Sequence, residues 1–231
     1  MQNKEFEKLL TDALNDAELK SSDIPSIDLY VDQIINLHAE KLKEGSERFF
    51  DRQLTKTMIN NYAKDRVITP VSGKKYTKEQ IIQILTIYTL KGTLSINEIK
   101  RMLQGAYATE GFDGGTLVEL YDKYTNSKEN TRDYAQKVVG EMLAQNGLDI
   151  ENDDDYFVAV ATISAMSAFM KSIAQAMIDA KYPDTSDESE PEKEKKEKDK
   201  DKEKKEKEKK EKKEKKEKKK KSTDEGADKD E

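Results

Sequence analysis

The sequence predicts a mainly α-helical fold with one small β-hairpin, followed by a highly charged tail. Apolar residues recur at intervals of three and four along most of the first 182 positions, which is the spacing of amphipathic helices. In the middle of the chain, a proline and a serine-glycine pair separate two short strand-like stretches, which is typical of a hairpin. Residues 183–231 contain 20 basic and 20 acidic residues and almost no apolar side chain, so they cannot bury a core.

Helical spacing and capping residues divide the first 182 residues into a series of predicted helices. Thr77 followed by Gln80, and Ser95 followed by Glu98, are capping boxes that mark two of the helix starts. The last helix is apolar around most of its circumference, which indicates burial inside the fold or in a dimer interface. The predicted helices lie at residues 3–18, 26–44, 55–64, 77–91, 95–103, 117–124, 134–143 and 156–182.

The hairpin is predicted between the third and fourth of these helices. Pro70 and the pair Ser72-Gly73 force a turn, and we expect Val67-Ile68 and Lys75-Tyr76 to pair across it as short antiparallel strands. The local order is therefore helix, hairpin, helix, helix.

Composition excludes most catalytic and metal sites. The chain has no cysteine and one histidine, which rules out disulfides, thiolate zinc sites and any site that needs two histidines. No glycine-rich phosphate loop, nucleophile elbow or catalytic carboxylate pair stands out, and the acidic run Asp149–Asp155 lacks the glycine of a calcium-binding loop. We therefore expect a protein that is not an enzyme and that needs no cofactor and no metal.

The expected compartment is the cytoplasm. The acidic N-terminal residues do not follow the pattern of a signal peptide. The longest uncharged run, Tyr156–Met170, has 15 residues, whereas a bilayer span needs roughly 20. No membrane association is expected, although attachment through residues 156–178 is a third, less favoured hypothesis.

Basic residues are concentrated between positions 51 and 105. This stretch carries 10 basic and 4 acidic residues, whereas residues 1–50 carry 6 and 11, and residues 106–182 carry 6 and 13. A phosphate backbone responds to such local charge rather than to the net charge of −6. An ordinary mixed-charge surface is the alternative interpretation.

Residues 57–103 carry a recognisable series of motifs: a short helix ending in an aromatic residue, a turn with a proline, a Lys-Tyr pair and two capped helices. The residues that mark these features are Tyr62, Pro70, Tyr76, Ser95, Glu98 and Ile99. This order resembles the DNA-binding domain of MerR-type regulators, in which a recognition helix is followed by a leucine-proline wing, an Arg/Lys-x-Tyr return and a Ser-Leu-x-Glu-Ile helix. The resemblance implies a winged helix-turn-helix with a small β-hairpin wing.

The chain departs from that family at three points. It has Ile59 and Asn60 where MerR proteins usually have an arginine before paired aromatic residues, it has Arg66 where they have glycine, and its wing is shorter. Over most of residues 20–180, the sequence more closely resembles an uncharacterised bacterial family called domain of unknown function 1836. That second resemblance implies no established activity.

The resemblance and the local charge together predict the DNA contacts. On the predicted helix at 55–64, Asn60 and Lys64 are expected on the exposed side, while Ile59 and Tyr62 can point inward. Asparagine suits adenine edges in the major groove and lysine suits phosphates, although asparagines near a helix end can also simply cap it. Cations at the hairpin are expected to contact the phosphate backbone, whereas packing is favoured over base stacking for the ring of Tyr76. The predicted DNA-binding residues are Lys56, Asn60, Asn61, Lys64, Arg66, Lys74, Lys75 and Tyr76.

Four regions are expected along the chain. They are an N-terminal helix at 1–20, a MerR-like winged-helix domain at 24–105, a helical dimerisation or effector region at 106–182, and a low-complexity Lys/Glu-rich tail at 183–231 that is disordered or a single helix. The expected function is sequence-specific transcriptional regulation by a homodimer on double-stranded DNA, with an effector of unknown identity. The alternative is a non-enzymatic helical adaptor for protein interactions that has lost DNA binding.

Overall fold

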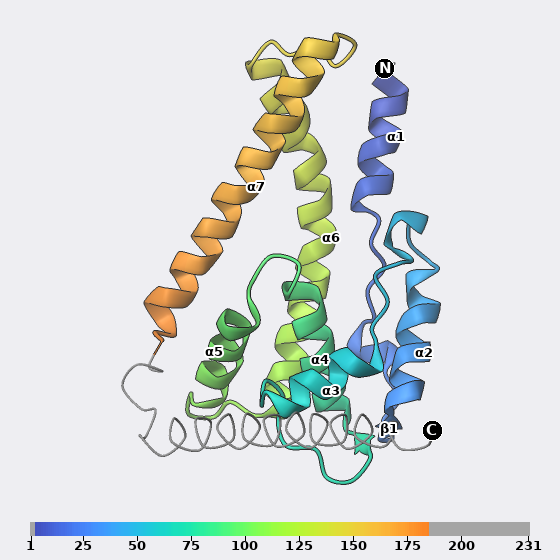
Figure 1. Ribbon diagram of the computed structural model, residues 1–231, viewed down its shortest axis with the longest axis vertical. Coiled ribbons are helices and arrows are strands. Elements are labelled where there is room, and N and C mark those ends of the chain that lie inside the picture. The colour runs from blue at the N-terminus through green and yellow to red at the C-terminus, as the bar shows by residue number, and fades with distance from the viewer. Residues whose placement is uncertain (1–2, 185–231) are drawn as a thin grey trace, which may run out of the picture. The chain divides into compact units, whose positions relative to one another are not determined.

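The structure is a computed structural model that describes residues 3–184 (Figure 1). The expectations for the Lys/Glu-rich tail fall almost entirely outside the described residues. Within those residues the chain forms seven α-helices, two short 3-10 helices (Ser21–Asp23 and Glu47–Phe49) and two strands, so the predicted mainly helical fold class is confirmed. The helices and strands are α1 (Asn3–Leu14), β1 (Leu29–Tyr30), α2 (Val31–Leu42), α3 (Lys56–Lys64), β2 (Lys75–Tyr76), α4 (Lys78–Leu90), α5 (Ile96–Tyr107), α6 (Gly114–Gln145) and α7 (Asp153–Lys181).

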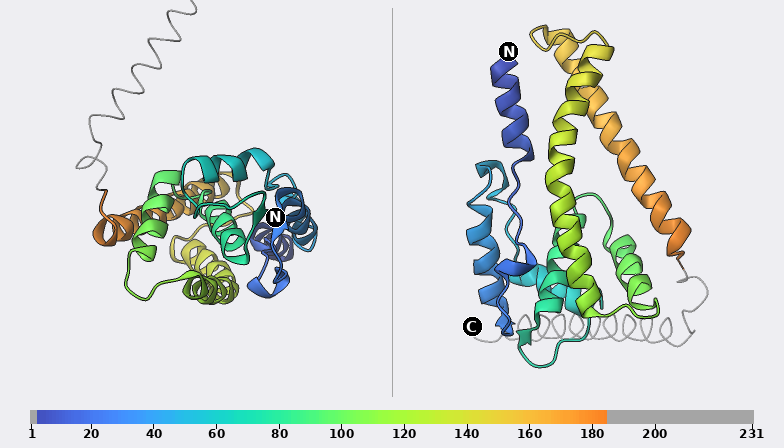
Figure 2. Two further views of the ribbon diagram at one scale, coloured as in Figure 1. Left: turned by 90° about the horizontal axis from the view of Figure 1, so that it is seen from below. Right: turned by 180° about the vertical axis from the view of Figure 1, so that it is seen from behind.

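Helix α4 forms the centre of the core. Its isoleucines Ile81, Ile82, Ile84 and Ile87 are fully buried, because α2, α3, α5 and α6 surround it (Figure 2). Burying one such side chain stabilises the fold by roughly 2 kcal/mol. The Thr77 capping box predicted from the sequence is present, and α4 therefore begins where its local sequence directs.

The two strands do not pair as predicted. β2 pairs with β1, with Leu29 opposite Tyr76, and not with Val67-Ile68. The predicted hairpin is wrong because Val67 and Ile68 are buried in the core without forming a strand. The start predicted for the second helix, near Ser26, is also wrong. Leu29 and Tyr30 form the strand that pairs with β2, so α2 begins only at Val31.

Helix α6 is a single helix of 32 residues where two helices were predicted. The polar stretch that separates the two apolar segments faces the segment that follows α1. There Lys128 contacts Asp16 (2.5 Å) and Glu18 (2.8 Å), and Arg132 contacts Asp16 (3.0 Å). Polar residues in the middle of α6 therefore bind a neighbouring segment instead of ending the helix.

Helix α7 is much more exposed than its composition suggested. Its bounds agree closely with the prediction, but burial inside the fold, one of the two predicted environments, is not observed for most of its apolar residues. Among the described residues, α7 is the one helix whose length and mean hydropathy (1.6 over 18 residues) would allow it to cross a membrane. The large apolar side chains that α7 exposes are Tyr156, Phe157, Val158, Val160, Phe169, Met170, Ile173 and Met177.

Candidate nucleic-acid interface

Helix α3 presents one polar side to solvent. The hydroxyl of Thr55 accepts a hydrogen bond from the backbone N–H of Met58 (3.2 Å), so Thr55, one of two threonines that could cap this helix, is the cap. Ile59 and Tyr62 are buried against the core and so fix the orientation of the helix. The opposite side carries four of the predicted DNA-binding residues, all exposed: Lys56, Asn60, Asn61 and Lys64.

The helix before α3 does not approach it through a tight turn. Helix α2 packs against α3, but residues 43–55 connect them, and this connection includes the short 3-10 helix Glu47–Phe49 with Phe49 buried. The fold therefore contains a helix pair ending in an exposed polar helix. It does not confirm the winged helix-turn-helix that the MerR resemblance implies.

The predicted wing is an irregular loop, which we call the 69–74 loop. Two glutamines of α4 anchor its base: the backbone N–H of Thr69 donates to Gln83 Oε1 (2.8 Å), and Gln80 Nε2 donates to the Pro70 carbonyl (2.9 Å). Both glutamines are buried, so these bonds are costly to lose. Gly73 turns the tip with φ +78°, in the left-handed region that favours glycine. Sequence reasoning missed this anchor, although two glutamines within an isoleucine-rich helix were a visible signal.

The lysines after this turn are exposed, but the tyrosine is not. Lys74 and Lys75 lie at the surface, and Lys75 Nζ lies 5.0 Å from the ring centre of Tyr30. Tyr76 is only 6% exposed, and burial raises the pKa of its hydroxyl. The predicted DNA contact of Tyr76 is therefore not supported by its position, because β2 turns its ring into the core. The 69–74 loop and α3 lie at the same end of the fold (Figures 1 and 2).

Most cations of this region are not neutralised by carboxylates. Of the ten basic side chains between positions 51 and 105, nine make no ion pair with any residue of the described range 3–184. Arg101 is the exception, since it pairs with Asp179 of α7. Elsewhere, half of the described cations are paired, as Lys128 is with Asp16. The local excess of positive charge in the sequence is therefore also an excess of unpaired charge at the surface.

Arg66 occupies an unfavourable backbone conformation directly after α3. Its φ is +53°, which makes it the non-glycine residue with positive φ among the described residues. Side chains with a Cβ lose about 1 kcal/mol in this region relative to glycine. An arginine at this position therefore lowers stability and adds an exposed positive charge beside Lys64 and the 69–74 loop.

We expect the Arg66→Gly variant to be more stable and to bind DNA less well. Relief of the backbone strain should raise the free energy of unfolding by up to about 1 kcal/mol. Chemical denaturation measures this gain, and titration with duplex DNA measures the loss of affinity, about threefold to tenfold for one phosphate contact. A stabilised variant with unchanged affinity would show that Arg66 does not contact DNA.

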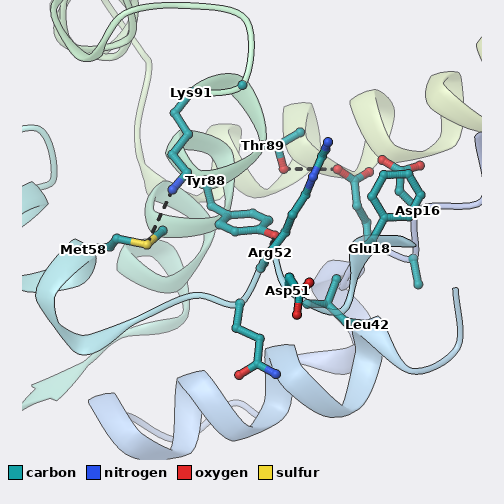
Figure 3. Close-up of a pocket in the computed structure, with 13 residues that line it drawn as sticks. Asp16, Glu18, Leu42, Asp51, Arg52, Met58, Tyr88, Thr89 and Lys91 are labelled. Carbon is teal, nitrogen blue, oxygen red and sulfur yellow. Dashed lines mark hydrogen bonds between the residues drawn. The ribbon is translucent and has the colours of Figure 1, made fainter. Parts of the chain in front are cut away.

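A pocket of about 630 Å³ lies next to α3 (Figure 3). One side carries acidic residues, including Glu18, whose carboxylate accepts from Thr89 (3.1 Å). Lys91 lies across the pocket, where its Nζ donates to Met58 Sδ (3.5 Å) and burial lowers its pKa. The central ring is that of Tyr88, whose hydroxyl donates to a backbone carbonyl of the α2–α3 connection. The volume is in the range of small-molecule sites, and Met58 joins the pocket to α3.

Among residues 3–184, no group of three or more potential metal ligands converges. Residues 19–124 match the model of the family described as Domain of unknown function (DUF1836). No curated protein and no solved structure matches the chain.

The match to DUF1836 covers α2 to α5, both strands and the beginning of α6. The resemblance to this family is therefore confirmed over the segment that carries the candidate interface. The match confirms no MerR-like segment, and it ends before most of α6 and all of α7.

Proposed function

We propose that the protein is a sequence-specific DNA-binding transcriptional regulator. The observation that carries this proposal is the unpaired positive surface formed by α3, Arg66 and the 69–74 loop. Such a surface gains free energy by releasing counterions from a phosphate backbone. The strained arginine supports the proposal further, because strain of this kind is found preferentially at functional positions.

The two parts of the surface would have different roles. The exposed side of α3 carries an asparagine and a lysine one helical turn apart, Asn60 and Lys64, which suits a helix in the major groove. Lys74 and Lys75 lie at an exposed turn and would contact phosphates, which orient the protein without reading sequence.

The Asn60→Ala variant tests the reading of bases by α3. If Asn60 contacts an adenine edge, its loss should weaken binding to the preferred site by about 1–3 kcal/mol, or roughly fivefold to 150-fold, and should relax selectivity at one position. Binding to unrelated DNA should change little. Asn36→Ala, on the exposed side of α2, is the matched control and should retain wild-type selectivity.

Selection from a random duplex library with the full chain at physiological salt tests the proposed function directly. Enrichment of one motif, especially a two-fold symmetric one, is the expected result for a dimeric regulator. A folded protein that enriches no motif would contradict sequence-specific binding.

An effector could act through the pocket beside α3. A small molecule bound between Tyr88 and Met58 would press on the buried side of α3 and so change the position of its exposed side. Linkage then requires that DNA and effector alter each other's affinity by the same factor.

A non-enzymatic adaptor for protein interactions is the second candidate function. It is favoured by the exposed apolar residues of α7 and by the long α2–α3 connection, which differs from that of a helix-turn-helix. Retention of a protein partner by a variant that has lost DNA affinity would favour this candidate.

A further inference from the structure

The C-terminal half of α7 has two chemically different sides. One side is fixed on α5: Gln175 Nε2 donates to Glu98 Oε1 (2.6 Å), Asp179 pairs with Arg101, and Ile178 is buried in the core. Beyond the helix end, the ring of Tyr182 packs directly on Gly105 and leaves no room for a Cβ there. Polar and apolar contacts thus hold this side of α7 in place.

The other side is apolar and uncovered. Phe169, Met170, Ile173 and Met177 are 64%, 57%, 55% and 68% exposed, and we call these four residues the open stripe. Their spacing of three and four residues places them on one side of the helix, about half a turn away from the side that faces α5. Figures 1 and 2 show α7 at the outside of the fold, with α5 against one end of it. Contiguous exposed apolar side chains of this kind mark an interaction surface.

We propose that the open stripe pairs with the open stripe of a second copy of this chain, with the two α7 helices antiparallel. A stripe at intervals of three and four packs against an identical stripe by inserting side chains between those of its partner. A two-fold axis at Ile173, the midpoint of the stripe, places each side chain against the same set from the other copy. This pairing would supply the dimer that the proposed function calls for.

Charge determines the orientation. The first turn of α7 carries Asp153, Asp154 and Asp155. In a parallel pair these carboxylates would lie beside their own copies and repel each other. In an antiparallel pair about Ile173 they lie at opposite ends, and the two helix dipoles oppose.

The size of the stripe determines the strength of the dimer. The open stripe and the exposed alanines beside it, Ala176 and Ala180, would bury roughly 500 Å² per copy, or about 1,000 Å² in total. This area is at the lower end for specific interfaces, so we expect a dimer that dissociates in the micromolar range.

A membrane is a poorer occupant of this surface. A span of roughly 20 residues beginning at Tyr156 would place Lys171 and Gln175 in the hydrocarbon. Gln175 and Asp179 also hold the helix against α5, and these contacts would be broken by insertion into a bilayer.

Sedimentation of the full chain over a concentration series tests the pairing. We expect a monomer–dimer equilibrium in the wild type and a shift of at least 30-fold toward monomer in Ile173→Asp. Ile27→Asp is the matched control, because Ile27 is a 69% exposed isoleucine outside α7, and it should dimerise like the wild type. A wild type that stays monomeric at 200 μM, or an Ile173→Asp variant that still dimerises, would overturn the proposal, as would flotation of the wild type with phosphatidylglycerol vesicles. Selection from the DNA library tests the proposed function and sedimentation tests the pairing of α7, so failure of one proposal can be told apart from failure of the other.

Cross-linking tests the orientation and does not depend on the charged variant. The chain has no cysteine, so a single introduced thiol reports one position. In the antiparallel pair, Ile173→Cys lies at the two-fold axis and should form a disulfide-linked dimer, whereas the thiols of Ala180→Cys would lie roughly 20 Å apart along the axis and should not. Equal cross-linking at both positions would indicate parallel helices and would contradict the proposed arrangement.

Discussion

The Lys74→Glu, Lys75→Glu double variant is expected to bind duplex DNA about 100-fold more weakly than the wild type. Both side chains are exposed and make no ion pair with a described residue, so their reversal removes two phosphate contacts and adds two repulsive charges. The dependence of log affinity on log salt concentration should become shallower by about 2 units, since each phosphate contact contributes about 0.9. Fluorescence anisotropy at several salt concentrations measures both quantities.

The control for this variant is the same reversal on a different surface. Lys4 and Lys8 of α1 are also exposed, and their replacement by glutamate changes the net charge equally. If the positive surface of α3 and the 69–74 loop binds DNA, the α1 variant should lose much less affinity. Equal losses in the two variants would show that only net charge matters, and unchanged affinity in the first would exclude the loop from the interface.

The parts of this fold that were predictable from sequence are those set by neighbouring residues. The capping boxes at Thr77 and Ser95 locate two helix starts, and the helical spacing around Ile59 correctly assigns the buried and exposed sides of α3. The strand pairing was not predictable in this way. The partner of Tyr76 is Leu29, far away in the chain, and Val67 fills the core instead of extending a strand.

The candidate site shows the same division. Exposure of Asn60 and Lys64 follows from the period of a helix, and the structure places both as expected. The anchor at Gln83 and the positive φ of Arg66 depend on packing between distant segments. A local pattern can mark an unusual residue, as a glutamine within an isoleucine-rich helix does, but it does not say which distant segment that residue meets.

The stability of the protein is expected to fall by about 3 kcal/mol as the pH decreases from about 6.5 to about 4, because of His38 alone. This side chain, the one histidine of the chain, is 5% exposed on α2, and its ring meets that of Tyr88 edge-on at 4.4 Å. Among residues 3–184, its Nδ1 has no hydrogen-bond partner. Burial lowers the pKa of His38 to about 4, whereas an unfolded histidine has a pKa of about 6.5.

The sign follows from proton binding. Between these two pKa values the unfolded chain binds a proton at His38 and the folded chain does not, so acid favours unfolding within this window. Hydrogen bonds from Ser95 lower the carboxyl pKa of Glu98. This shift changes stability only at pH values below the ordinary carboxyl pKa, which is mainly outside the window set by His38. Denaturation of the wild type and of His38→Phe, which keeps an aromatic ring against Tyr88, should give curves whose difference shrinks as the pH rises to 6.5. Parallel curves, or an NMR titration of the folded histidine with a midpoint near 6.5, would show that the imidazole is hydrated and that its burial does not control acid stability.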